Sequence, residues 1–327
     1  MKQISQDRVH LTTAEAQDLS EQALRRIGYD AEEARIIADH VVDAALCGYE
    51  YSGLPKILNV AEHRQLKLPR QAMRALHETP VSALYGGGNN NGMVAMYRAT
   101  QVAIAKAGEH GLAVVGVNNS WMSGRSAHYV EMVARAGMVG IHSVSSTPHV
   151  SAPGSAGPAN GTNPIAFGFP TENDPLVIDL GTSAFMGTDL IFQERRGAVL
   201  PEGVAMDARG RPTRDPAQVH ALLPFGGYKG FALALAMQAL GVLAGSGSSY
   251  DRTYGYLIMA IKPDLMLPLA DFRRDMSAML ARIKATPRQP GVDEIRIPSE
   301  RAFREREQRR LQGIVLDCAV VDSLRAL

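Results

Sequence analysis

Cysteine is scarce in this 327-residue sequence, and neither sign of charge is in clear excess. The 2 cysteines, Cys47 and Cys318, lie in separate apolar runs, which excludes a disulfide framework and favours buried thiols in a reducing cytoplasm. Lysine and arginine total 34 against 33 aspartate and glutamate residues, so the formal net charge is only +1. We therefore expect small-molecule partners rather than nucleic acid or an anionic membrane surface.

Long apolar runs, metal-ligand spacings and a common hydrolase motif are also missing. The longest uncharged stretch, residues 230–250, contains Gln238 and two Gly-Ser pairs, so we expect a buried helix ending near Gly245 rather than a membrane span. No export signal is expected at the amino-terminal end. The histidines lack HExxH-type spacing, so no metal site is expected. The absence of G-x-S-x-G removes the commonest serine-hydrolase interpretation.

Hydrophobic residues make up 46% of the chain, enough for a large core, and the length suggests two domains. Thr12 with Glu15, and Asp30 with Glu33, form capping boxes that predict two helices, each ended by a glycine. Further helices are predicted at residues 56–65, 93–107, 269–284 and 299–312. Short apolar runs predict strands at residues 81–85, 112–117, 139–144, 164–168, 176–180 and 255–262. We therefore expect an α/β (α+β) protein.

The run LYGGGNNNG, residues 84–92, lies between a predicted strand and a predicted helix, where a dinucleotide fingerprint would stand. Asn91 occupies the position of the third glycine that the fingerprint requires. No acidic residue stands at the end of a predicted strand about 20 residues further on. A turn with helix-capping asparagines is the better interpretation.

The run PFGGYKG, residues 224–230, precedes the apolar helix and has features of an anion-binding loop. Gly226 and Gly227 allow close backbone approach, and Lys229 adds a positive charge near the unpaired N–H groups of a helix start. These features suit a phosphate, but a turn with a solvated lysine explains them equally well.

Two polar segments, GTNPIAFGFP and VIDLGTSAFMGTDL, lie within residues 161–189. An isolated aspartate usually caps a helix or lies in a turn, but Asp179 and Asp189 stand near many hydroxyl groups, which favours a site for an amide, a ribose or a carboxylate. The short polar side chains are Thr162, Asn163, Thr182 and Ser183.

Six segments in order resemble the type-2 malate/L-lactate dehydrogenase family: GYEYSG, NNSWMSGRSAHY, GTNPIAFGFP, VIDLGTS, PEGVAMDARGRPTRDP and LPFGGYKGFALAL. The resemblance covers nearly the whole chain and is closest in character to the Δ1-piperideine-2-carboxylate/Δ1-pyrroline-2-carboxylate reductases. It implies a homodimeric NAD(P)H-dependent oxidoreductase without a Rossmann unit. Residues 1–115 with 290–327 would form a helical dimerisation domain, and residues 116–289 a NAD(P)-binding domain on a mostly antiparallel sheet.

The resemblance also implies the residues that line a cleft between the domains. Those contacting the cofactor would be Lys56, Met122, Ser123, Gly124, Arg125, Ser126, Asp179, Leu180, Gly181, Thr182, Gly187, Thr188, Gly226, Gly227 and Lys229. Those contacting the substrate would be Lys56, Thr162 and Met122, with Lys56 in place of a family arginine. The imine-reductase branch favours NADPH, and NADH stays open because no acidic ribose-binding residue can be located.

The chain departs from the family at both of its histidines. The S-H-G loop, whose histidine donates the proton, is Tyr51-Ser52-Gly53 here, and the histidine of NS-x-H-x-G is Met122. The aspartate that assists the donor in the imine-reductase branch corresponds to Asp189. The proton-donor histidine of the family is therefore replaced, while the aspartate that assists it is kept.

Serine cannot replace an imidazole acid unaided, and this decides the expected chemistry. Ketone reduction develops negative charge on oxygen, and a positioned acid accelerates it by about 10²–10⁴-fold. A cyclic imine can enter already protonated, so it needs only a cation for its carboxylate and an anion nearby. Lys56 and Asp189 would supply these charges. We therefore expect reduction of a C=N bond next to a carboxylate, or of a related 2-oxo acid.

Two alternatives stay open. Tyr51 near Lys56 is a rival acid that would support a 2-hydroxyacid or ketone dehydrogenase, unless it is only an aromatic ring packed over the cleft. Loss of both histidines also fits a cofactor-binding protein without turnover, although the retained glycines and Lys229 argue against general decay. Trp121 and Met122 predict a pocket more apolar than is usual in the family.

Overall fold

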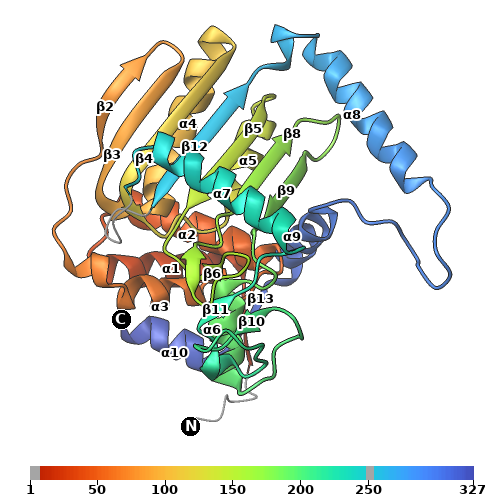
Figure 1. The fold of residues 1–327 in the computed structure, drawn as a ribbon. Coiled ribbons are helices and arrows are strands. Elements are labelled where there is room, and N and C mark those ends of the chain that lie inside the picture. Colours follow the sequence, from red (N-terminus) through yellow and green to blue (C-terminus); the bar gives the residue numbers. More distant parts are fainter. Residues whose placement is uncertain (1–7, 248–253) are drawn as a thin grey trace.

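In the computed structural model, which describes residues 8–247 and 254–327, the two ends of the chain meet in one helical part of the molecule (Figure 1). This part comprises β1 (Arg8–Leu11), α1 (Thr13–Arg26), α2 (Ala31–Leu46), α3 (Pro55–Glu62), the 3₁₀ turn η1 (Arg64–Lys67), α9 (Glu300–Gln312), β13 (Ile314–Asp317) and α10 (Cys318–Ala326). Strands β1 and β13 pair antiparallel, α10 contacts α1 and α3, and α9 contacts α2.

The predicted capping boxes begin α1 and α2. The Thr12 hydroxyl accepts a 3.2 Å hydrogen bond from the backbone N–H of Glu15, and the Glu15 carboxylate accepts one of 2.7 Å from the N–H of Thr12. Asp30 and Glu33 form the same reciprocal pair. Each box satisfies N–H groups that a first turn leaves unpaired, so local sequence fixes both starts.

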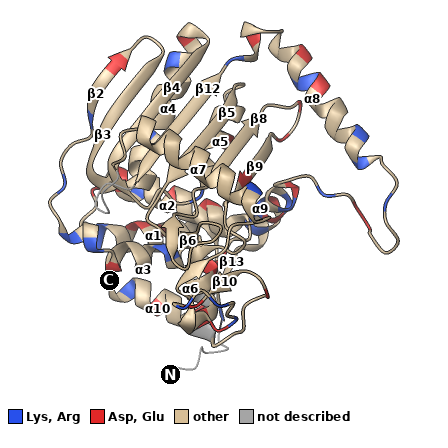
Figure 2. Cartoon of the chain, viewed as in Figure 1, with Lys and Arg blue, Asp and Glu red and all other residues tan. Residues whose placement is uncertain are grey.

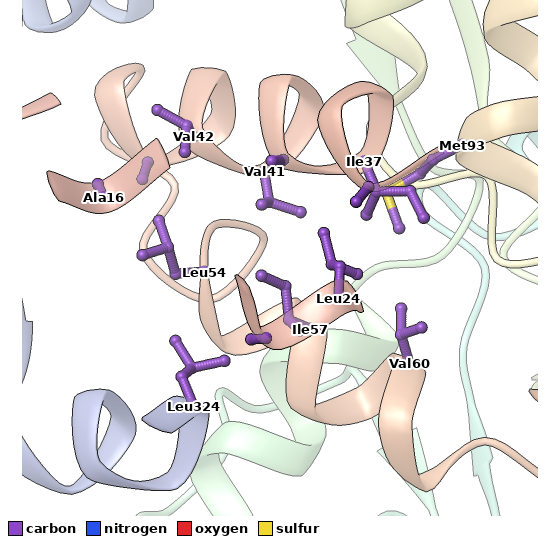
Figure 3. Close-up of a cluster of buried hydrophobic side chains, with 14 of the residues drawn as sticks. Ala16, Leu24, Ile37, Val41, Val42, Leu54, Ile57, Val60, Met93 and Leu324 are labelled. Carbon is purple, nitrogen blue, oxygen red and sulfur yellow. The ribbon is translucent and has the colours of Figure 1, made fainter. Parts of the chain in front are cut away.

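One apolar core joins these helices, and Figure 3 shows its centre. Its fully buried side chains include Leu24, Ile37, Leu54, Ile57, Val60 and Leu324. Burying an aliphatic side chain of this size contributes about 1.5–3 kcal/mol. Ile57 and Val60 bind α3 to the core, and the polar residues Lys56 and Asn59 lie on the adjacent side of the helix.

A seven-stranded sheet occupies the other part of the described chain, in the order β2-β3-β4-β12-β5-β8-β9. Its strands are β2 (Arg74–Thr79), β3 (Ser82–Asn91), β4 (Leu112–Trp121), β12 (Gly255–Ile261), β5 (Val139–Ser145), β8 (Ile165–Phe169) and β9 (Leu176–Leu180). Strands β3 and β4 pair parallel, and the other neighbours pair antiparallel.

Helices cover both faces of this sheet (Figure 1). Helix α5 (Ser126–Arg135) approaches β8 closely, because a Cβ on Gly168 would lie 2.2 Å from the carbonyl oxygen of Val130. Helix α7 (Tyr228–Leu243) packs on β5 and β12, where a Cβ on Gly241 would lie 2.0 Å from Ser145 Oγ. Helix α4 (Gly92–His110) packs on β3, β4 and β12.

A smaller unit lies below the sheet in Figure 1 and has its own small core around Leu200 and Leu222. It contains a four-stranded sheet in the order β10-β11-β6-β7, together with helix α6. The bounds are β6 (Val150–Ser151), β7 (Pro158–Asn160), α6 (Gly187–Arg196), β10 (Ala205–Met206), η2 (Pro216–Gln218) and β11 (Ala221–Leu222). After η4 (Pro263–Leu265), helix α8 (Leu269–Lys284) extends away from the body.

The expected mixed α/β class is confirmed, with two corrections to its elements. Strand β3 continues to Asn91, so the glycine–asparagine run is strand rather than turn, although the Asn91 side chain does cap α4. Helix α7 was expected to be buried, yet Leu235, Val242 and Leu243 are 54%, 59% and 66% exposed. The ribbon of α7 is almost entirely tan in Figure 2, and Lys229 is the one charged residue in the sequence of this helix, so its exposed side is apolar.

Both cysteines are free thiols, Cys47 buried and Cys318 partly exposed. Among residues 8–247 and 254–327, the acidic, histidine and cysteine side chains form no cluster of metal-ligand type. The helices in the same ranges are too short or too polar to cross a membrane.

Candidate active site

The loop before α3 turns back tightly onto α2. A Cβ on Gly53 would lie 2.8 Å from the Cβ of Ala45, so this position requires glycine. The turn brings the Tyr51 hydroxyl within 3.4 Å of Asn59 Nδ2 on α3. The side chain of Ser52, in the same turn, is partly exposed. Tyr51, in the loop expected to replace the family's proton-donor loop, therefore contacts α3 at Asn59.

Lys56 lies in the first turn of α3. Burial lowers the pKa of its ammonium to about 8. In the described part of the chain, no carboxylate forms an ion pair with Lys56, and this includes Asp189. A lysine ammonium that has no acidic partner and is partly exposed is suited to binding a carboxylate ligand.

The segment after β4 rests on α2. Met122 and Gly124 have positive φ angles of 57° and 73°. A Cβ on Gly124 would lie 2.3 Å from Nε2 of His40, and the same Nε2 accepts a 2.8 Å hydrogen bond from the backbone N–H of Arg125. Burial, followed by the charges of His128 and Arg125, lowers the pKa of His40 well below its ordinary value, so the ring stays neutral and accepts this bond.

The predicted cofactor residues Ser123, Arg125 and Ser126 have internal contacts here. The Arg125 guanidinium donates to Asp43 and lies 5.5 Å from the centre of the Tyr49 ring. The Ser123 carbonyl accepts a hydrogen bond from the Tyr129 hydroxyl, and Ser126 is buried. These contacts fix the shape of the segment.

Asp179 joins β9 to α5. Its carboxylate accepts a 2.8 Å hydrogen bond from the backbone N–H of Ala127, in the first turn of α5. Burial raises the pKa of Asp179, and the Ala127 bond opposes this rise. The carboxylate therefore acts as a cap on α5, a role that sequence reasoning did not assign to it.

The segment containing residues 180–187 lies beside Thr162. The backbone N–H and hydroxyl of Thr182 both donate to the Thr162 carbonyl, at 2.8 and 2.9 Å. A Cβ on Gly181 would lie 3.4 Å from Met186 Sδ, and one on Gly187 would lie 3.8 Å from Thr162 Cγ2. Leu180, the last residue of β9, leads into this segment. The side chain of Thr188 is outside the described part of the structure.

Asn163 has a structural role. Its buried amide donates to the carbonyl of Ala234 at 3.1 Å and to Gln238 at 3.0 Å, so it ties the segment to α7. Asp189 lies in the first turn of α6 with an exposed side chain, and burial of part of its surface raises the pKa of its carboxyl.

The PFGG loop adjoins the same segment. The N–H of Phe225 donates to the Thr182 carbonyl at 3.1 Å. Gly226 and Gly227 have φ angles of 55° and 59°, and an added Cβ at either position would meet no atom within 4 Å. No side chain caps the start of α7, and Lys229 in its first turn is exposed. This open backbone, helix start and lysine together fit a phosphate group.

The predicted site residues thus form three groups with few direct links. The groups are the loop and first turn of α3 with Tyr51 and Lys56, the Met122–Ser126 segment, and the Thr162 and Thr182 segment with the PFGG loop. Asp179 joins the Met122–Ser126 segment to β9. The ring of His63 stacks on Trp121 with centroids 4.4 Å apart, which joins α3 to the same segment. A hollow of about 560 Å³ between β9, α8 and α9 contains none of the predicted site residues.

Sequence reasoning missed His40, Asn59 and His63. Lys56, Asn59 and His63 are spaced by three and four residues, so the pattern of one polar helical face was visible in the sequence. His40 supports Arg125 across 85 residues of chain, a contact that no local pattern contains.

Known proteins resemble the chain over almost its whole length. A malate/(S)-sulfolactate dehydrogenase of Methanothermus fervidus is 31% identical, over 97% of this chain and 96% of its own. The crystal structure of a malate dehydrogenase from Entamoeba histolytica has a TM-score of 0.91 at 23% identity, covering 98% of this chain and 97% of that one, and shows the same fold.

A solved structure with a different named substrate is also similar. The Δ1-piperideine-2-carboxylate reductase from Pseudomonas syringae pvar. tomato has a TM-score of 0.85 at 27% identity, covering 97% of this chain and 99% of that one. Residues 11–325 match the family model described as malate/L-lactate dehydrogenase. The protein is therefore an oxidoreductase that belongs to the malate/L-lactate dehydrogenase family.

Proposed function

We propose that the protein is an NADPH-dependent reductase of a C=N bond next to a carboxylate, as in a cyclic imino acid, or of a related 2-oxo acid. Family membership supports a reductase of this general class. The observation that carries the substrate proposal is Lys56, a cation on the polar side of α3 without an acidic partner in the described residues. It stands in a site where Ser52 and Met122 replace the family's histidines.

The cofactor would lie along the three residue groups described above. Gly226, Gly227 and Lys229 at the start of α7 would hold phosphate, since their backbone is open and their charge is positive. The Thr162 and Thr182 segment adjoins this loop and would hold the rest of the cofactor. When bound, the reduced nicotinamide supplies the hydride. NADPH is preferred to NADH on the resemblance to the imine-reductase branch.

The remaining residues have distinct roles in this proposal. Lys56 binds the substrate carboxylate, and Asp189 places a negative charge near a protonated imine. Trp121, which is 1% exposed, and Met122 keep water from the reacting carbon. Ser52 cannot serve as an acid unaided, and Tyr51 is the rival donor for a ketone substrate.

We also propose an architecture for the working enzyme. The seven-stranded sheet would bind the cofactor in a non-Rossmann manner, within residues 116–289, and residues 1–115 with 290–327 would form the second domain. The protein would act as a cytoplasmic homodimer. The exposed apolar side of α7, with Leu235, Val242 and Leu243, supports association with a second copy, because charged residues are absent from that side of the helix.

Oxidation of NADPH and of NADH tests the proposed function with a panel of cyclic imino acids and 2-oxo acids. We expect the largest kcat/KM for NADPH with Δ1-piperideine-2-carboxylate or a similar ring. Turnover restricted to simple 2-oxo acids would favour the Tyr51 alternative. Tight NADPH binding without turnover of any substrate would favour a non-catalytic binder.

A further inference from the structure

His63 lies on the polar side of α3, at its carboxyl-terminal cap. Residues 56, 59 and 63 fall within about 60° of one another at about 100° per residue. The buried Ile57 and Val60 point into the core on the adjacent side of the helix (Figure 3), with Val60 about 40° from Lys56. His63 therefore shares the surface that presents Lys56 and Asn59, and Asn59 contacts the Tyr51 hydroxyl.

The ring of His63 is held in a fixed orientation. It lies parallel to the Trp121 ring, with an interplanar angle of 3° and centroids 4.4 Å apart, and Trp121 Nε1 donates to the Asn89 carbonyl at 3.1 Å. Trp121 directly precedes Met122, the position of the family's second histidine. The imidazole of His63 thus lies beside Trp121, next to the position where the family has a histidine and this sequence has Met122.

The two ring nitrogens of His63 have different environments. Nδ1 accepts a 3.2 Å hydrogen bond from the backbone N–H of Gln65, which places the proton of the neutral ring on Nε2. Within residues 8–247 and 254–327, Nε2 has no hydrogen-bond partner. This nitrogen is therefore available to a ligand.

Among the described residues, the charged groups that act on His63 are both cationic. Burial lowers the pKa of His63, and Arg64 from η1 and Lys56 from α3 lower it further. The Trp121 ring that stacks on His63 carries no charge. A carboxylate ligand bound at Lys56 would offset this positive field and raise the pKa of His63 toward its ordinary value.

We propose that His63 is the proton donor when this site reduces a 2-oxo acid, an inference that rests on the proposed function. The carbonyl carbon accepts the hydride that reduced nicotinamide supplies, and the C=O π pair moves to oxygen. The imidazolium forms when Nδ1 takes a proton from solvent and gives up the hydrogen bond from the Gln65 N–H. Its Nε2–H bond breaks as the new O–H bond forms, and Nε2 then takes a replacement proton from solvent. An already protonated cyclic imine needs no such donor, so one site would serve two substrates with different dependence on His63.

Replacing His63 with Gln separates the two reactions. We expect kcat/KM for a 2-oxo acid to fall by about 10²-fold or more and kcat/KM for a cyclic imino acid to stay within threefold. H63F keeps an aromatic ring against Trp121 and should show the same pattern. H77Q, at an exposed histidine of β2, is the matched control. Fluorescence measurement of NADPH affinity checks that each variant still binds the cofactor.

A second readout does not depend on turnover. NMR titration of the His63 ring, assigned by its loss in H63Q, should give a pKa below the ordinary histidine value. Oxamate, a non-reducible 2-oxo acid analogue, should raise this pKa by at least half a unit. A His63 pKa that oxamate leaves unchanged would contradict the proposal.

The activity outcomes distinguish this inference from the proposed function. Reduction of 2-oxo acids that survives H63Q overturns the role of His63. Reduction of cyclic imino acids without any reduction of 2-oxo acids also overturns it and leaves the proposed function intact. If the wild-type protein reduces neither substrate class, the proposed function fails, and the role of His63 fails with it.

Discussion

The guanidinium of Arg306 lies 2.6 Å from the carboxylate of Glu131 and 2.9 Å from that of Asp43. This contact joins α9, near the carboxyl-terminal end of the chain, to α5 and α2. Burial alone would raise the pKa of Glu131, but the hydrogen bond and charge of Arg306 lower it. The Glu131 carboxylate is therefore buried as an ion that depends on Arg306, whereas Asp43 is partly exposed and also pairs with Arg125.

We predict that R306M destabilises the protein by about 3–5 kcal/mol, because it leaves the buried carboxylate of Glu131 without its main partner. R310M is the matched control, since Arg310 forms an exposed ion pair with Glu307 and its loss should cost at most about 1 kcal/mol. Urea unfolding measures both. Equal stability losses in the two variants would show that the buried network does not stabilise the fold as described.

Stability should fall as the pH decreases below about 6.5. His142 is buried, with its Nδ1 2.8 Å from the Leu257 carbonyl, and burial lowers its pKa to about 4. Between the ordinary histidine pKa and this value, the unfolded chain binds a proton that the folded protein does not. The free energy of unfolding therefore decreases with falling pH, by at most about 1.4 kcal/mol per unit for each such group.

Urea unfolding from pH 4.5 to 7.5 tests this dependence. H142N should reduce the change of the unfolding free energy with pH, and the buried His40 should account for what remains. H110N, at an exposed histidine, should leave this pH dependence unchanged. The same slope in H142N and in the wild-type protein would exclude His142 as a source.

The start of α7 should bind a cofactor phosphate through Lys229. We predict that K229Q weakens NADPH binding about tenfold, equivalent to about 1.4 kcal/mol, and that the difference shrinks at high salt. K262Q, between β12 and η4, serves as the charge-matched control. Calorimetry or cofactor fluorescence gives the affinities. An unchanged NADPH affinity in K229Q would place the phosphate elsewhere.

The apolar side of α7 should form the contact between two copies. V242D introduces a charge at a side chain that is 59% exposed in the single chain, and we predict a shift from dimer to monomer in sedimentation velocity. L311D is the control, because Leu311 on α9 is 90% exposed and lies outside this side of α7. A wild-type monomer, or an intact dimer in V242D, would contradict the proposed interface.

Local sequence predicted the elements whose ends depend on local contacts. The capping boxes at Thr12 and Asp30 gave the starts of α1 and α2, and the bounds of β9 and α8 match their predicted ranges. Strand β2 was missed because it is polar and mostly exposed, and its hydrogen bonds to β3 define it. The exposure of α7 was missed because an evenly apolar sequence does not distinguish contact within the chain from contact with a second copy.

The candidate site was only partly predictable, because some of its contacts join residues that are far apart in the sequence. The glycines and lysine of the PFGG loop are close in sequence, so the sequence alone could propose this loop, and its binding of phosphate stays a prediction. The contacts of Asp179 with Ala127, and of His40 with Arg125, link residues 52 and 85 positions apart. Such contacts depend on how the sheet and helices pack, so the capping role of Asp179 required the structure.

Asp189 gives the most direct test of the central proposal, because it is the anion expected beside a protonated imine. D189N should lower kcat/KM for Δ1-piperideine-2-carboxylate by about 10²-fold, equivalent to about 2.7 kcal/mol, with NADPH affinity unchanged. The measurement is steady-state NADPH oxidation by the wild-type and D189N proteins with this imino acid and with pyruvate. Imine reduction that survives D189N, or rapid pyruvate reduction undiminished in D189N without any imine reduction, would contradict the account.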